Sequence, residues 1–169
     1  MMDYMVVWKK FPTRRYCEKV MEELSSNNEN FGIFSFDLNN LKKINDNMGH
    51  TYGDDLISGF ARILKETFEK EAVVGRMGGD EFIVIIRSDD GRIDYKTFRK
   101  KLQHVIDEYN HKESRFKYSV ACGYADSTEA GDNNGNVDAR QIYSMADDRM
   151  YVHKRKIKEK MKQEKSGNE

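Results

Sequence analysis

The stretch Arg76–Phe82 reads Arg-Met-Gly-Gly-Asp-Glu-Phe and lies between two apolar runs. Apolar runs separated by paired glycines predict a tight β-hairpin, with Gly78 and Gly79 supplying the positive φ angles of its turn. Asp80 and Glu81 then stand side by side at the tip, where two fixed negative charges repel each other. An acidic turn of this kind is most often only solvated, so its interpretation depends on what lies beside it.

A second acid changes the interpretation, because Asp37 ends the apolar run Phe31–Phe36. If this run forms a strand beside the hairpin, the Asp37 and Asp80 carboxylates converge. Converging carboxylates repel unless a hard cation lies between them, and Mg²⁺ is typically held by one or two carboxylates together with substrate phosphates. The pair therefore predicts a Mg²⁺ site that acts on a phosphate-bearing substrate.

Length and charge limit the remaining classes of function. The 169 residues are enough for one domain with a hydrophobic core. Lysine plus arginine equals aspartate plus glutamate, at 29 each, so the zero net charge argues against a nucleic-acid partner. No apolar run approaches the roughly 20 residues of a membrane span, and the N-terminus lacks the features of a signal peptide. Cys17 and Cys122 show no metal-ligand spacing, so we expect reduced thiols and a cytoplasmic protein.

Hydrophobic spacing predicts the elements that must position these acids. We expect a first helix capped by Thr13 and a frayed, charged stretch at 154–169. The other expected ranges are a strand 31–36, a short helix 38–46, a long helix to about residue 69, the hairpin 72–87, a helix 98–109, a strand 116–124, a mobile loop 126–137 and a helix 142–150. After the first helix the order is βααββαβα, which predicts an α+β fold whose antiparallel sheet carries helices on one side.

Two separated motifs carry a resemblance to a known family. Residues 36–54 read Phe-Asp-Leu-Asn-Asn-Leu-Lys-Lys-Ile-Asn-Asp-Asn-Met-Gly-His-Thr-Tyr-Gly-Asp, and the hairpin motif 76–82 follows. Together they resemble the GGDEF domain of diguanylate cyclases, from residue 11 to about residue 158. The resemblance implies a palm-like fold of the nucleotide-cyclase and ferredoxin-like kind, with flanking helices and the GGDEF hairpin. The boundaries that follow are an N-terminal segment 1–12, a GGDEF domain 13–158 and a charged C-terminal tail 159–169.

The resemblance also implies an activity, cofactors and partners. Two GTP molecules would condense to cyclic di-GMP with release of pyrophosphate, using two Mg²⁺ (or Mn²⁺) ions per active site. Catalysis would need a homodimer, and a sensor domain would lie upstream in a longer parent protein. The residues that match the family's site are catalytic Asp80 and Glu81; metal-binding Asp37, Asp80 and the Leu38 carbonyl; guanine-binding Asn45, Asp54 and His50; and phosphate-binding Lys42, Lys154 and Lys158.

The chemistry of these residue types agrees with the implied roles but leaves two of them open. The Asp54 carboxylate can accept from guanine N1–H and N2–H₂, which are donors that adenine lacks at those positions, and the Asn45 amide can serve guanine N3 or N2. Either Asp80 or Glu81 can assist deprotonation of the ribose hydroxyl. His50 fits a loop-packing role as well as a ligand contact.

The chain departs from the family's pattern at four places. Asn39 stands where members often carry aspartate, and because this position is not a direct metal ligand we expect the change to be tolerated. The family's opening pattern resembles Asp-x-Leu-Thr-Gly-Leu-Pro-Asn-Arg-Arg, and at 6–15 only Pro12 and the arginine pair remain. Lys158 stands where the family often has arginine, which keeps the charge but loses the bidentate fork. Many members carry an inhibitory Arg-x-x-Asp site upstream of the hairpin, but the matching positions here are Glu69 and Ala72, so that site is missing.

Three functions remain as alternatives. The chain is an active diguanylate cyclase, a catalytically silent GTP-binding regulatory domain, or a structural interaction module whose acids are only solvated. The competent side chains at every matched metal and guanine position favour the first alternative. The divergent N-terminal segment would favour the second if it prevented dimerisation.

Overall fold

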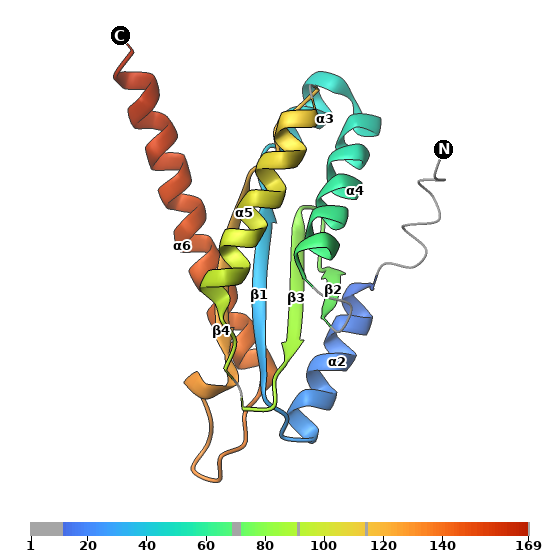
Figure 1. The fold of residues 1–169 in the computed structure, drawn as a ribbon, viewed down its shortest axis with the longest axis vertical. Helices are drawn as coiled ribbons and strands as arrows, with labels where there is room; N and C mark the ends of the chain where they lie inside the picture. Colours follow the sequence, from blue (N-terminus) through green and yellow to red (C-terminus); the bar gives the residue numbers. More distant parts are fainter. Residues whose placement is uncertain (1–11, 69–71, 91, 114, 169) are drawn as a thin grey trace.

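The computed structural model describes residues 12–68, 72–90, 92–113 and 115–168 (Figure 1). After an N-terminal helix the main elements follow in the predicted order βααββαβα. Within the described ranges, no helix is long and apolar enough to cross a membrane. The bounds are α2 Arg14–Ser26, β1 Phe31–Leu38, α3 Leu41–Met48, α4 His50–Thr67, β2 Val73–Arg76, β3 Glu81–Arg87, α5 Tyr95–Lys112, β4 Val120–Asp126, the 3-10 helix η1 Ser127–Glu129, and α6 Ala139–Ser166.

The four strands form one antiparallel sheet in the order β2-β3-β1-β4. The inner strands are therefore β3 and β1, and β1 is paired with β3 on one side and with β4 on the other. The register sets Asp37 opposite Glu81 of β3 and Ala121 of β4. The predicted pairing of the 31–36 strand with the hairpin is thus confirmed, and it brings Asp37 next to the turn that carries Asp80.

Helices cover both faces of the sheet, so the expectation of helices on one side was wrong. One face is covered by α4 and α5 (Figure 1). On this face Phe34 contacts Phe98 of α5, and Phe36 contacts Phe60 of α4. On the other face, Ile33 and Ile83 pack against residues of α2 and α6. The reason lies in β1, where every residue of Phe31–Leu38 is buried. Because apolar side chains project from both faces of this strand, both faces must be packed against helices to exclude water.

The hairpin turn differs from the prediction in its backbone geometry, because neither Gly78 nor Gly79 has a positive φ angle. The turn is a longer loop, in which the Met77 N–H donates to the Glu81 carbonyl at 2.8 Å. The Arg76 guanidinium donates to the carbonyl of Gly78 at 3.1 Å and to that of Gly79 at 2.7 Å. A side chain thus stabilises the loop, in place of the left-handed backbone of a two-residue turn.

Several element boundaries also differ from the predictions. The short helix expected over 38–46 begins only at Leu41, because Leu38 still pairs within the sheet as the last residue of β1, and the expected loop 126–137 contains η1. The fourth strand begins at Val120 instead of residue 116, because its partner β1 ends at Leu38 and the pairing stops there. The last helix continues to Ser166, although 154–169 was expected to fray. Lysine, glutamate, glutamine and methionine are strong helix formers, so this charged composition favours continuation of the helix.

Candidate functional site

The side chains of Asp37 and Asp80 meet at one end of the sheet, as predicted. Asp37 is the second-last residue of β1, and the following residue, Leu38, donates its backbone N–H to the Asp80 carbonyl at 2.8 Å. This bond joins the end of β1 to the turn before β3. Both acids line the same cavity, which has a volume of about 590 Å³.

The cavity lies between α3 and the distal part of α6. Its lining residues are Asp37, Leu38, Asn39, Asn40, Leu41, Lys42, Lys43, Asp46, Asn47, Asp80, Lys154, Ile157, Lys158 and Met161. The structure therefore brings together all the residues predicted to hold metal and phosphate. Four lysines face three aspartates in this lining, which suits a ligand that carries several negative charges together with a cation.

Asp37 is a buried acid with only half of its carboxylate satisfied. The residue is 5% exposed, and Lys154 Nζ donates to its Oδ2 at 2.9 Å. Its other oxygen, Oδ1, is buried without a hydrogen-bond partner. A buried carboxylate oxygen without a donor is costly. The geometry therefore leaves Oδ1 available to a cation.

The donor set fits a divalent cation of the Mg²⁺ type. Asp37 and Asp80 supply carboxylate oxygens, which are the ligands that hard cations prefer. Among the described residues, no group of three or more histidine, cysteine, aspartate or glutamate side chains forms a closed metal site. Mg²⁺ is commonly held by one or two protein carboxylates and takes its remaining ligands from substrate phosphates and water, so this pair of carboxylates is sufficient.

Charges at the site shift the protonation of its acids and of its lysine. Burial raises the pKa of Asp80, and the Asp37 carboxylate raises it further. Burial likewise raises the pKa of Glu81, with added repulsion from Asp147 of α6. The hydrogen bond to Asp37 raises the pKa of Lys154, which keeps this lysine charged. The raised acid pKa values reflect partial burial first and repulsion between the neighbouring carboxylates second.

The residues predicted to bind guanine lie apart from this cavity, at the junction of α3 and α4. Asn45 is on α3, while His50 and Asp54 are exposed positions on the first turns of α4. Asn45 Oδ1 is buried without a hydrogen-bond partner, and it abuts Gly53 so closely that an added Cβ there would lie 1.8 Å away. The structure thus forms two groups, one for metal and phosphate and one at the helix junction.

Glu81 also lies outside the cavity lining. It pairs with Asp37 across the sheet. Of the charged groups around Glu81, Asp147 on α6 raises its pKa most. Asp147 in turn accepts a hydrogen bond from the Ser35 hydroxyl at 3.1 Å. Of the two acids left open as a base, Asp80 is the one that borders the cavity.

Sequence reasoning missed part of the cavity wall. Lys43 and Asp46 of α3 line it, as do Ile157 and Met161 of α6. The signal was present for α6, because positions 154, 157, 158 and 161 share one helical face at i, i+3, i+4 and i+7. The signal became usable only once the helix was known to continue past residue 154.

The palm-like sheet, the hairpin and the pair of acids beside a lysine-rich cavity define a class of fold and site, and comparison with known proteins identifies the family. The chain belongs to the GGDEF family, because the family model described as "Diguanylate cyclase, GGDEF domain" matches residues 9–160.

Individual relatives agree with the family assignment. The chain is 31% identical to the signaling protein YkoW of Bacillus subtilis over 156 residues, covering 88% of this chain and 19% of the relative. It is 30% identical to the diguanylate cyclase DgcS of Shewanella oneidensis over 122 residues, covering 72% of this chain and 38% of the relative. The chain therefore spans less than half the length of these two relatives.

A solved structure supports the fold. It is a microbial GGDEF domain described in a novel interaction mode with cyclic di-GMP, and it superposes with a TM-score of 0.66 at 27% sequence identity. The match covers 86% of this chain and 88% of the solved chain. The palm-like fold expected from the sequence is thus confirmed.

Proposed function

We propose that this domain is a diguanylate cyclase, which condenses two GTP molecules into cyclic di-GMP and releases two pyrophosphates. The observation that carries the proposal is the unpartnered, buried Asp37 Oδ1 beside Asp80 in a cavity lined by lysines. Such a cavity suits a nucleoside triphosphate with its cation. The family membership supports the same reaction.

In the proposed mechanism, the chain's own residues bind and orient the triphosphate. Lys42 from α3 and Lys158 from α6 approach the phosphates from opposite walls of the cavity. Lys154 would exchange its bond with Asp37 for a phosphate oxygen when the site is loaded. Bound Mg²⁺ or Mn²⁺, two ions with each GTP, would be held by Asp37, Asp80 and the Leu38 carbonyl and would neutralise charge at the α-phosphate.

The nucleophile in this reaction is the ribose 3′-hydroxyl of the second GTP, held by a second copy of the domain. Its proton has to be removed as the new phosphodiester bond forms and pyrophosphate leaves. Asp80 and Glu81 are the candidate bases, because both carboxylates follow the Gly78–Gly79 turn and stand next to the end of β1 that carries Asp37. Asp80 is the stronger candidate because it borders the cavity.

Guanine recognition is assigned to the α3–α4 junction. The exposed Asp54 carboxylate would accept from guanine N1–H and N2–H₂, and the buried Asn45 Oδ1 lacks a donor that guanine could supply. His50 begins α4 and would border the base. A site built on acceptors for these donors discriminates strongly against a base that lacks them.

The domain organisation is part of the proposal. The catalytic unit would comprise 13–158 and act as a cytoplasmic homodimer, with 1–12 leading from a sensor domain and 159–169 as a charged tail. The structure continues α6 across the boundary at residue 158. Of the N-terminal segment, residues 1–11 lie outside the described residues.

The proposed function is tested by incubating the purified chain with Mg²⁺ and an equimolar mixture of GTP and ATP, followed by chromatography of the products. We expect cyclic di-GMP as the main product, because the Asp54 carboxylate would face the N1 lone pair of adenine. A predominantly mixed or adenine product would contradict the guanine assignment. A matched incubation with EDTA should give no product.

The Lys154–Asp37 ion pair favours one second candidate, a silent GTP-binding domain, since this lysine already compensates the charge of Asp37. Calorimetric titration with GTP and Mg²⁺ separates the alternatives. Saturable GTP binding without product would support the silent domain. Neither binding nor product would support a structural interaction module.

Feedback by the product should be weak at the family's inhibitory position. Losing one partner of a buried charged contact typically costs about 2–5 kcal/mol, and both partners are replaced here. Ala72 is a partly buried methyl group packed on the core, while Glu69 lies outside the described residues. We therefore expect initial rates at several GTP concentrations to show competitive inhibition only, from product rebinding at the guanine site.

The double substitution Glu69→Arg with Ala72→Asp restores the missing pair of residue types and serves as the matched gain-of-function variant. It should introduce non-competitive inhibition by cyclic di-GMP that the parent chain lacks. Non-competitive inhibition of the parent chain at low micromolar product, lost on changing Ala72, would sink this prediction.

A further inference from the structure

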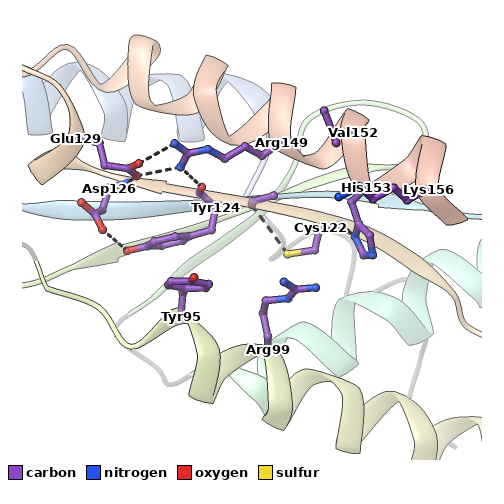
Figure 2. A pocket seen from close by; sticks show the side chains of 11 residues that line it. Tyr95, Arg99, Cys122, Tyr124, Asp126, Glu129, Arg149, Val152, His153 and Lys156 are labelled. Carbon is purple, nitrogen blue, oxygen red and sulfur yellow. Dashed lines mark hydrogen bonds and ion pairs between the residues drawn. The ribbon is translucent and has the colours of Figure 1, made fainter.

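A second cavity lies on the opposite side of α6 from the carboxylate cavity, at the free edge of β4. Its volume is about 540 Å³, and it shares no lining residue with the first cavity. The walls are α5 and α6, and β4 forms the floor between them (Figure 2). The lining residues that could bind a ligand are Tyr95, Arg99, Tyr124, Arg149, His153 and Lys156.

Side chains of α6 satisfy the outer edge of β4 and thereby orient the cavity's donors. The Cys122 N–H donates to His153 Nδ1 at 2.9 Å, and Arg149 Nη1 donates to the Tyr124 carbonyl at 2.7 Å. Because Nδ1 accepts this bond, the neutral imidazole of His153 carries its hydrogen on Nε2. His153 is therefore a donor with a determined tautomer, and its orientation is held by the backbone of β4.

Positive charge in this cavity is only partly compensated. Arg149 is paired with Glu129 at 2.7 Å. The side chains of Arg99 and Lys156, by contrast, make no hydrogen bond or ion pair within the part of the chain that the structure describes. Figure 2 shows the Arg99 guanidinium directed toward Cys122 and the ring of His153. Burial lowers the pKa of His153, and the charges of Arg99 and Lys156 lower it further. Both cations are therefore close enough to His153 to affect its imidazole electrostatically.

We propose that this cavity binds a small phosphomonoester. The donors available are the planar fork of Arg99, the ammonium group of Lys156 and the Nε2–H of His153. A terminal phosphate has three acceptor oxygens and up to two charges, so it can use all of these donors, whereas a carboxylate has only two oxygens. A volume of about 540 Å³ lies within the usual range of small-molecule sites.

An aromatic surface beside the cations suits a phosphomonoester that also carries a planar ring. Tyr95 lies one helical turn before Arg99 on α5 and is 37% exposed. Its ring stacks on Tyr124 with centroids 5.0 Å apart and planes 15° apart, which holds the ring in place. A mononucleotide would place its phosphate at the cations and its base on or near this ring.

The test is calorimetric titration of the full chain at constant ionic strength with three probes, namely inorganic phosphate, ribose 5-phosphate and AMP. AMP is chosen because the proposed GTP site selects guanine. We expect saturable binding, reduced about tenfold or more by Arg99→Gln and by Lys156→Gln, since a charge-assisted hydrogen bond is lost in each. The matched controls Lys100→Gln and Lys160→Gln remove a lysine from the same helices outside either cavity and should leave the affinity unchanged.

The outcomes show which part of the ligand is recognised, and they distinguish specific binding from a general attraction of anions. Tighter binding of AMP than of ribose 5-phosphate supports a nucleotide site, and equal binding of all three probes supports a site for the phosphate group alone. No saturable binding at about 10 mM probe overturns the proposal. Equal losses in the control variants also overturn it, because they would show non-specific attraction. The measurement needs no turnover, so its result is independent of the cyclase assay.

Discussion

Replacing Asp80 with asparagine is expected to abolish cyclic di-GMP synthesis while slightly stabilising the fold. Metal-assisted charge stabilisation is worth several kcal/mol at the transition state, so the initial rate should fall at least about 100-fold. The stability effect has the opposite sign, since Asp80 is partly buried and its charge is repelled by Asp37. An uncharged isostere removes this repulsion and should raise the free energy of unfolding by up to about 1 kcal/mol.

The measurement combines initial rates with urea unfolding in EDTA, so that bound metal does not contribute to stability. Asp89→Asn is the matched control, because it removes an exposed acid from the loop after β3 and should change neither quantity. Substantial product from purified Asp80→Asn protein would refute the assigned metal site. A marked loss of stability would show that the carboxylate is structural.

Asp37→Asn should abolish synthesis equally but without the gain in stability. Asp37 is buried although it lies near the end of a strand, and its carboxylate forms an ion pair with Lys154. Losing the carboxylate leaves a partly buried ammonium group with a weaker acceptor, which costs stability. The two substitutions are therefore expected to reduce catalysis equally but to change the free energy of unfolding differently. Equal losses of activity would indicate that both acids serve one site, and the difference in stability would reflect their different surroundings.

Replacing Gly123 with alanine is expected to cause the largest loss of stability of any glycine-to-alanine substitution among the glycines that the structure describes. A Cβ at this position of β4 would lie 2.0 Å from the Ala146 carbonyl oxygen and 2.2 Å from the Met150 nitrogen, both in the backbone of α6. Backbone atoms cannot rotate away as a flexible side chain can, so the helix itself must move. Overpacking of this kind costs about 3 kcal/mol.

The free energy of unfolding from urea titration measures this effect, with Gly131→Ala as the matched control. At Gly131 the nearest atom to an added Cβ is 3.5 Å away, which is ordinary contact, so the change should stay within about 0.5 kcal/mol. Synthesis should also fall in the Gly123 variant, because α6 carries Lys154 and Lys158. Equal unfolding midpoints for the two variants would show that α6 packs less closely on β4 than described.

Local patterns were sufficient for the order of elements and for the family. The apolar run ending at Asp37, the hairpin motif and the helical stripes each depend on neighbouring residues, and side-chain periodicity reports such local structure directly. The convergence of Asp37 and Asp80 also followed from the sequence, because a strand end and a hairpin tip meet when their strands pair in register. The roles of the matched residues stay predictions until the variants are measured.

Other features depended on how distant segments pack, and local spacing does not encode that. Lys154 was expected to contact phosphate, but its bond to Asp37 joins residues 117 positions apart and depends on how α6 crosses the sheet. The cover on both faces of the sheet, the close approach of α6 at Gly123 and the cavity at the edge of β4 depend on the same crossing. The chain's sequence determined which elements form and which acids meet, whereas the position of α6 decided what surrounds them, because long-range contacts arise only from tertiary packing.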